Sequence, residues 1–236
     1  MSGARAAAAS LVERYALPPD EIERRSLGIV APAVGERFAD PGEQSVATRV
    51  VYAAGDLELA RSLRFSCAPL PAAIAALRGR CHVVTDVRMV AAALDRARLQ
   101  RLGCELLCAI DTPGVAEAAR GAGVTRSLAG IRLLAARLDA AVVVIGNAPT
   151  ALLGLLDLVD AGTVRPACVI GMPVGFVAAA EAKAELLRRH LPAIAIEGTR
   201  GGSAVAAAAL NVLLRLALDE PAVPLPAPSE IGGPPR

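Results

Sequence analysis

The amino-acid sequence predicts a doubly wound α/β domain, in which helices cover both faces of a mainly parallel sheet of about five strands. Three glycine-bearing turns in the second half of the chain, at 146–152, 171–177 and 200–203, each follow a short apolar run and open a helical pattern. Repeated strand-to-helix turns of this kind are typical of parallel sheets. The run at 142–145 is apolar at every position, as expected of a strand that is buried on both faces.

Hydrophobic periodicity predicts the remaining elements. Helices are expected at 19–29, 44–63, 71–77, 89–94, 113–120 and 127–137, and strands at 82–85, 106–110, 142–145, 168–170 and 194–196. Five strands are too few for a closed eight-stranded barrel, so the predicted sheet is open. We expect one domain over residues 1–218, followed by a disordered proline-rich tail over 219–236.

Composition limits the classes of partner. The chain has 236 residues, a net charge of +2 and a mean hydropathy of +0.49. Without a basic block or an aromatic platform, no nucleic-acid partner is expected. The most apolar stretch, 140–156, is interrupted by Asn147 and Pro149, so it predicts a strand, a turn and a helix rather than a membrane span. The N-terminus lacks a signal-peptide pattern, which predicts a cytoplasmic protein without a membrane partner.

The cysteine pattern predicts neither a disulfide framework nor a metal site. Five cysteines are scattered along mostly apolar runs, which favours small buried hydrophobic side chains. Cys104 and Cys108 have no histidine or third cysteine near them in the sequence. The ligand site is instead expected at the carboxyl ends of the strands, where helix N-termini carry free amides and partial positive charge. Such a crevice favours anionic groups.

Several separate motifs, in order along the chain, resemble those of the precorrin-8X methylmutase family. They are Arg25-Ser26, Asp86-Val87-Arg88-Met89-Val90, Thr125-Arg126-Ser127, the turns at 146–152 and 171–177, Glu181-Ala182-Lys183, and Arg200-Gly201-Gly202-Ser203-Ala204 with Ala209-Leu210-Asn211. The resemblance extends from about Ile22 to about Leu214. It implies a homodimeric isomerase of cobalamin biosynthesis that moves a methyl group from carbon 11 to carbon 12 of a tetrapyrrole. The substrate is precorrin-8X or its cobalt form, the product is hydrogenobyrinate or its cobalt form, and no cofactor is implied.

The sequence departs from this family at Tyr52, in Arg49-Val50-Val51-Tyr52-Ala53-Ala54-Gly55. The family has a histidine there, which donates a proton or a hydrogen bond to the ring nitrogen beside the migrating methyl. A phenol is protonated at neutral pH and donates hydrogen bonds, so Tyr52 is the candidate catalytic residue. If full proton transfer is required, the pKa of Tyr52 must be lowered, and the positive charge of Arg49 would act in that direction. The alternative is that Tyr52 only packs on a helix beside Val51.

The candidate substrate-binding residues are Arg25, Ser26, Arg49, Asp86, Met89, Arg126, Ser127, Asn147, Thr150, Arg200, Gly201, Gly202 and Ser203. The turn at 200–203 is the best anion site, because paired glycines let a ligand approach the backbone closely. Arg126 is suited to a bidentate contact with a carboxylate, or else is solvated beside an N-cap at Thr125 or Ser127. Several of these residues also have a purely structural interpretation. Arg25 and Ser26 would form a surface pair, Asp86 would cap its helix, and Asn147 and Thr150 would shape a turn. Glu181 and Lys183, from another of the motifs, are expected at a solvated or interface position.

Three functions are therefore compared. The first is the isomerase, with Tyr52 in place of the histidine. The second is a non-catalytic paralogue that binds a corrinoid and lacks the acid. The third, an unrelated nucleotide-binding enzyme, is disfavoured because no G-x-G-x-x-G follows the first strand and no phosphate-loop lysine is present.

Overall fold

The computed structural model describes residues 10–35 and 37–220 and contains one six-stranded sheet. Its order is β1-β6-β5-β4-β2-β3, and all neighbouring strands are parallel except the antiparallel pair β1 and β6. The strands are β1 (Leu63–Ser66), β2 (His82–Thr85), β3 (Glu105–Cys108), β4 (Val142–Ile145), β5 (Cys168–Gly171) and β6 (Ala193–Ile196). The predicted doubly wound, mainly parallel sheet is confirmed, with one more strand than expected.

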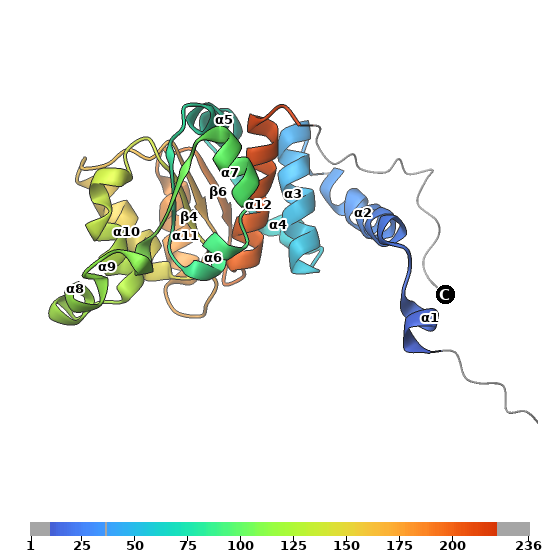
Figure 1. The fold of residues 1–236 in the computed structure, drawn as a ribbon, viewed down its shortest axis with the longest axis horizontal. Coiled ribbons are helices and arrows are strands. Elements are labelled where there is room, and N and C mark those ends of the chain that lie inside the picture. The colour runs from blue at the N-terminus through green and yellow to red at the C-terminus, as the bar shows by residue number, and fades with distance from the viewer. Residues whose placement is uncertain (1–9, 36, 221–236) are drawn as a thin grey trace, which may run out of the picture.

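Helices cover both faces of the sheet (Figure 1). They are α1 (Leu11–Tyr15), α2 (Pro19–Gly35), α3 (Pro41–Ala54), α4 (Leu59–Ser62), α5 (Pro69–Arg78), α6 (Arg88–Ala92), α7 (Arg96–Leu102), α8 (Val115–Ala122), α9 (Arg126–Leu133), α10 (Pro149–Asp160), α11 (Ala179–Arg188) and α12 (Ser203–Ala217), with short 3₁₀ turns at Ala109–Asp111 and Ala135–Arg137. Val142 and Val144 of β4 belong to the core shared with α3, α5 and α12, whereas Val143 and Ile145 belong to the core shared with α9, α10 and α11. Alternate residues of one apolar strand thus face two separate helical layers.

The prediction of one helix over 44–63 was wrong at its second half. Gly55, in the left-handed conformation with φ 63°, ends α3 and donates its amide to the carbonyls of Val51 and Tyr52. Such a residue is a common helix terminator, because glycine adopts positive φ without a steric cost. The chain then makes the short α4 and enters β1, which pairs with β6 in the register Leu63 with Ile196.

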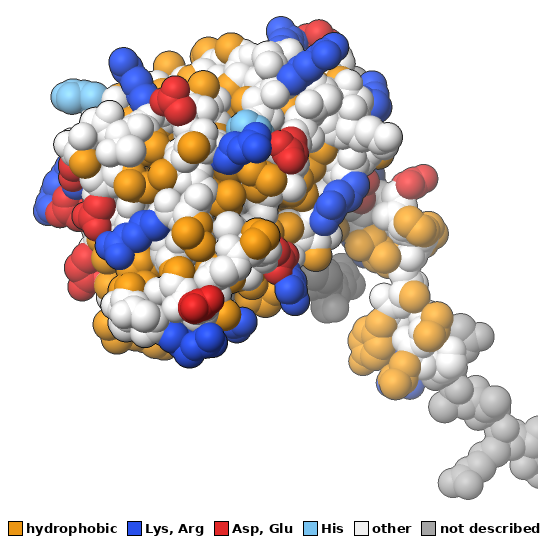
Figure 2. All heavy atoms as spheres, turned by 60° about the vertical axis from the view of Figure 1, so that its left-hand side comes forward, with side chains coloured by type: hydrophobic (Ala, Val, Ile, Leu, Met, Phe, Trp, Pro, Cys, Tyr) orange, Lys and Arg blue, Asp and Glu red, His pale blue; other side chains and the backbone are white. Residues whose placement is uncertain are grey.

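The chain before α3 extends away from the sheet. Helix α2 packs on α3, while α1 projects beyond it (Figure 1). Figure 2 shows hydrophobic side chains gathered on this projection. Those of Leu11, Val12 and Tyr15 in α1 are 71%, 71% and 73% exposed. The N-terminal segment therefore offers apolar surface that the rest of the described chain leaves uncovered.

The predicted tail begins at residue 219, and only its first two residues are described. Asp219 pairs with Arg78, and Glu220 pairs with Arg98 and Arg101. These two residues are held against the domain, and residues 221–236 lie outside the described part. Within residues 10–35 and 37–220, no helix combines the length and the hydropathy that a membrane crossing requires.

Candidate functional site

The three predicted glycine turns meet at the carboxyl edge of the sheet. A Cβ atom on Gly146 would lie 2.9 Å from Cα of Ser203, and one on Gly201 would lie 2.3 Å from the carbonyl oxygen of Met172. The amide of Gly202 donates to the same Met172 carbonyl at 2.8 Å. Glycine is required at both contacts because the backbones touch where a side chain would begin.

Asp86 lies under this junction and is completely buried. Its carboxylate accepts hydrogen bonds from the amides of Gly146, Asn147 and Ala148, at 3.1, 2.8 and 2.7 Å. Burial raises the pKa of Asp86, and the three amides act in the opposite direction. The expected cap on its own helix was wrong, because Val87 is the N-cap residue of α6 and no side-chain bond is made there. The Asn147 amide, expected to contact the ligand, is bound to Asp86.

The turn before α12 presents the strongest anion-binding geometry. Gly201 and Gly202 have φ values of 154° and 131°, and α12 then runs for 15 residues from Ser203. The amides of a first helical turn have no intrahelical acceptor, and the helix start carries partial positive charge. The Ser203 hydroxyl oxygen is buried and finds no hydrogen-bond partner among the described residues. The Arg200 side chain is half-exposed and lies 3.3 Å from Asp56, just after α3.

Lys183 differs most from its expected position. The sequence predicts it on a solvated or interface face, yet its side chain is 0% exposed. Its ammonium donates to the carbonyl oxygen of Arg200 at 2.5 Å, which links α11 to the turn before α12. Burial lowers the pKa of Lys183 to about 8. The buried residues of α11, Ala179, Ala182, Lys183 and Leu186, follow helical spacing, so periodicity places position 183 on the inner face, where a lysine is an unusual residue.

The loop between β5 and α11 adds an apolar rim beside the same turn. Phe176 and Val177 are 95% and 85% exposed. The loop is attached to the segment after β6 because the Gly175 amide donates to the carbonyl of Thr199 at 3.1 Å. Both residues belong to the turn at 171–177, but they were not among the predicted site residues.

Tyr52 lies in a separate cavity of about 320 Å³ between α3, α7 and α12. Its side chain is 37% exposed, and the Arg49 guanidinium lies 5.6 Å from its ring centroid, a cation–π arrangement. Arg49 also pairs with Glu23 of α2 at 2.8 Å. The remaining lining residues are Ala53, Asp95, Arg98, Ala208, Asn211, Val212 and Arg215. The sequence predicted Arg49 at this site and missed Arg98 and Arg215, because α7 and α12 are distant from Tyr52 along the chain.

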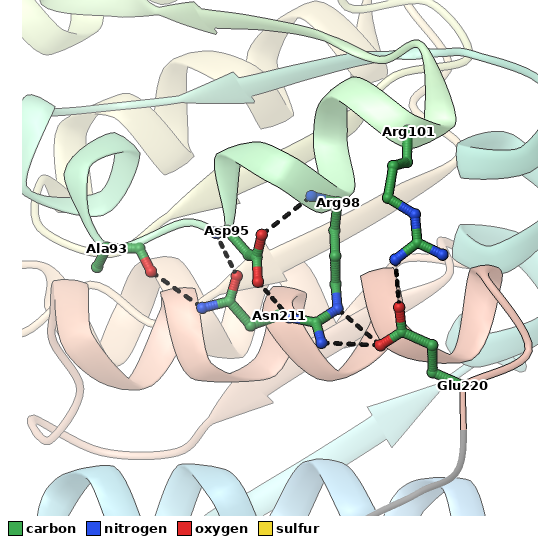
Figure 3. A network of polar contacts seen from close by, with 6 residues as sticks. All are labelled: Ala93, Asp95, Arg98, Arg101, Asn211 and Glu220. Atoms are coloured by element: carbon green, nitrogen blue, oxygen red, sulfur yellow. Dashed lines mark hydrogen bonds and ion pairs between the residues drawn. The ribbon is translucent and has the colours of Figure 1, made fainter.

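A polar network fixes α7 over α12 and builds one wall of that cavity (Figure 3). Asn211 of α12 donates to the Ala93 carbonyl and accepts from the Asp95 amide, both at 2.9 Å. Asp95 caps α7 through the Arg98 amide and pairs with the Arg98 guanidinium. Glu220 binds Arg98 from the other side at 2.8 Å. Asn211, part of a recognised motif, thus has a structural role that holds two helices in register.

The two regions are connected through the ion pair between Asp56 and Arg200. Asp56 follows the end of α3, the helix that carries Tyr52, and Arg200 opens the turn at the sheet edge. The structure therefore places the candidate catalytic residue and the candidate anion site on adjoining segments.

The other predicted residues are distributed around these regions. The Thr125 hydroxyl caps α9 through the Leu128 amide and contacts the Thr150 hydroxyl at 2.8 Å, which brings the starts of α9 and α10 together. Arg126 is exposed there, and Ser127 is buried. Met89 is 59% exposed beside Val90, which contacts Gly146.

Arg25 and Ser26 are the predicted residues that the structure brings neither to the turns nor to the Tyr52 cavity. Both make contacts within α2, with Glu21 and with the Ile22 carbonyl. Those contacts match the expectation of a surface pair for these two residues.

Comparisons with known proteins agree with this architecture. A family model described as precorrin-8X methylmutase matches residues 21–216. The cobalt-precorrin-8 methylmutase of Priestia megaterium is 37% identical over 199 residues, covering 84% of this chain and 88% of that protein. A precorrin-8X methylmutase of Sinorhizobium sp is 41% identical over 204 residues, covering 85% and 96%. The crystal structure of a precorrin-8X methylmutase from Thermus thermophilus matches with a TM-score of 0.76 and 37% identity, covering 84% of this chain and 98% of that one. Sequence and fold together show that the chain belongs to the precorrin-8X methylmutase family.

Proposed function

We propose that this protein is an isomerase of cobalamin biosynthesis that moves the methyl group of precorrin-8X, or its cobalt form, from carbon 11 to carbon 12. The observation that supports it most is the junction of three glycine turns at the sheet edge, in a chain that matches the family over 21–216. The acetate and propionate carboxylates of such a substrate suit the amides at the start of α12, with Arg200 beside them and the exposed Arg126 at the start of α9. The exposed apolar side chains of Phe176 and Val177 would shield the ring from water.

In this proposal Tyr52 donates a hydrogen bond to the ring nitrogen beside the migrating methyl. Its placement in a cavity of about 320 Å³, where its side chain is 37% exposed and the Arg49 guanidinium lies 5.6 Å from its ring centroid, supports the assignment, because a ligand can reach its hydroxyl there. General acid catalysis contributes about 10²–10⁴-fold to a rate. Replacing the tyrosine by phenylalanine should therefore lower turnover by up to that factor while leaving binding of the tetrapyrrole intact.

The second candidate function is a corrinoid-binding paralogue without isomerase activity. It is favoured by Tyr52, because the resemblance to the family implies a histidine at this position and this chain has a tyrosine. The two are separated by mixing purified protein anaerobically with precorrin-8X and following the absorbance change to hydrogenobyrinate, with Tyr52→Phe and Tyr52→His in parallel. Turnover that is lost in Tyr52→Phe supports the isomerase. Tight binding without turnover, together with activity gained in Tyr52→His, would establish the binding protein instead.

We also propose that the protein is a homodimer. The apolar side chains of Leu11, Val12 and Tyr15 on the projecting α1 support this, because exposed apolar patches commonly mark interfaces. Sedimentation equilibrium of the full chain should give twice the monomer mass. A triple substitution of these residues by serine should shift that equilibrium toward monomer, and a wild-type chain that sediments as a monomer at micromolar concentration would contradict the proposal.

A further inference from the structure

Lys183 is exceptional in the composition of the chain. Of its 25 lysine and arginine residues, Lys183 is the single lysine. It is also the one cationic side chain that is completely buried in the described part of the chain. Arginine has a larger, planar head that keeps its charge, whereas the ammonium of lysine is compact and loses its proton more readily when buried. The single departure from arginine therefore occurs where the size and chemistry of the cation matter most.

The contacts of Lys183 are directed at the turn before α12. Its ammonium donates to the Arg200 carbonyl at 2.5 Å, while Gly201 and Gly202 are held on the Met172 carbonyl by packing and by a hydrogen bond. Of these contacts, only the lysine brings a formal charge. Lys183 lies on α11, which packs on one face of the sheet, whereas α12 packs on the other face. The contact therefore links the turn before α12 to the opposite helical layer.

This buried ammonium has no counter-ion in the described part of the chain. No carboxylate among residues 10–35 and 37–220 forms an ion pair with it, and burial is the sole cause of its pKa shift. The charged side chains on the neighbouring elements are exposed or paired elsewhere: Glu181 and Asp157 are exposed, Glu185 pairs with Arg188 and Arg189, Asp160 with Arg189, Glu197 with Arg64, and Arg200 with Asp56. Burial lowers the pKa of Lys183 to about 8, so the ammonium is destabilised where it stands. An unpaired buried charge is costly, and an anionic ligand beside it would offset that cost.

We propose that Lys183 is a positioning residue for a substrate carboxylate: through the Arg200 carbonyl it holds the turn whose amides bind that carboxylate, and the bound carboxylate balances its charge. The proposal rests on the proposed function and deepens it, because it names the residue that orders the anion site. Lys183 acts through the turn and through its field, without touching the reacting carbon atoms.

The single lysine makes a direct test possible. Full-length protein grown with [¹³Cε]lysine gives one lysine side-chain resonance, whose pKa is read from a pH titration with and without hydrogenobyrinate. Binding should raise the pKa of Lys183 by about one unit, and by reciprocity hydrogenobyrinate should bind about tenfold more weakly at pH 9.5 than at pH 7. A resonance whose pKa is unchanged by saturating hydrogenobyrinate would overturn the proposal.

Two variants on α11 complete the experiment. Lys183→Met keeps the length and removes the charge, and Arg188→Met removes a cation from the exposed surface of the same helix. We expect Lys183→Met to raise the Kd for hydrogenobyrinate and the KM for precorrin-8X about tenfold, with kcat within twofold of wild type, and Arg188→Met to change neither. A purely structural lysine would instead lower the active fraction with KM unchanged, which contradicts the proposal.

The wild-type protein provides the reference that separates the two ideas. If it binds hydrogenobyrinate and Lys183→Met binds it equally well, the inference about Lys183 is wrong and the proposed function stands. If the wild type neither binds hydrogenobyrinate nor converts precorrin-8X, the proposed function itself fails, and the inference fails with it.

Discussion

Replacing Asp86 by asparagine tests how the turn at the sheet edge is held. The carboxylate accepts the Gly146 amide on Oδ1 and the amides of Asn147 and Ala148 on Oδ2. Asparagine has nearly the same shape but only one oxygen acceptor. If that oxygen takes over the two bonds of Oδ2, its NH₂ group faces the Gly146 amide, and two donors are then opposed in a buried site.

The expected loss follows from these three bonds. A buried donor left without a partner costs about 1–3 kcal/mol, and each charge-assisted bond that becomes neutral loses about 1 kcal/mol. The asparagine avoids burying a charge, which offsets part of this loss, because burial raises the pKa of Asp86 and disfavours its charged form. We therefore expect Asp86→Asn to lower the free energy of unfolding at pH 7 by about 2–3 kcal/mol.

Urea denaturation of both proteins, followed by circular dichroism, measures this difference. Asp139→Asn is the matched control, because Asp139 accepts a single amide, that of Arg165 at 2.9 Å, at the surface. It should stay within about 0.5 kcal/mol of wild type. An Asp86→Asn protein as stable as wild type would refute the reasoning. The free-energy cost of burying the carboxylate would then equal the stabilisation from its three hydrogen bonds.

Three further changes test the close packing and the buried lysine. Gly201→Ala places a Cβ 2.3 Å from the Met172 carbonyl at φ 154°, so it should destabilise the fold by about 1–3 kcal/mol and weaken hydrogenobyrinate binding, as measured by urea denaturation and absorbance titration. Gly130→Ala places its Cβ 2.1 Å from the Ala109 carbonyl and should cost about 2–3 kcal/mol in the same denaturation assay, without altering the Kd of the protein that folds. The pKa of Lys183 is lowered from 10.5 to about 8, so the unfolded state binds more protons between those values and the contribution of Lys183 to stability rises with pH across that window, by up to about 3 kcal/mol. Urea denaturation at pH 7.5 and pH 10 should show this rise in wild type relative to Lys183→Met, and parallel pH profiles would contradict it.

Local pattern was sufficient for most of the sheet. The apolar runs of β4, β5 and β6 stand out in the sequence because both of their faces are buried, and each is followed by a glycine-bearing turn. The run of β1 is different. Its four residues alternate between apolar and polar, and their strand conformation depends on pairing with β6, more than a hundred residues later. The helix predicted over 44–63 extends too far for the same reason, because local periodicity does not contain that pairing.

The candidate site, like the sheet, was predictable from the sequence only in part. The sequence by itself determined the three glycine turns and the strands that precede them, because a close backbone approach requires glycine and a buried strand requires apolar residues at consecutive positions. Only the tertiary structure decided which groups these turns meet. The amides at 146–148 bind a carboxylate that lies 60 residues earlier, and the lysine of α11 is turned inward onto the Arg200 carbonyl. Such contacts join elements from different parts of the chain, so they depend on how the layers pack rather than on the residues adjacent in sequence.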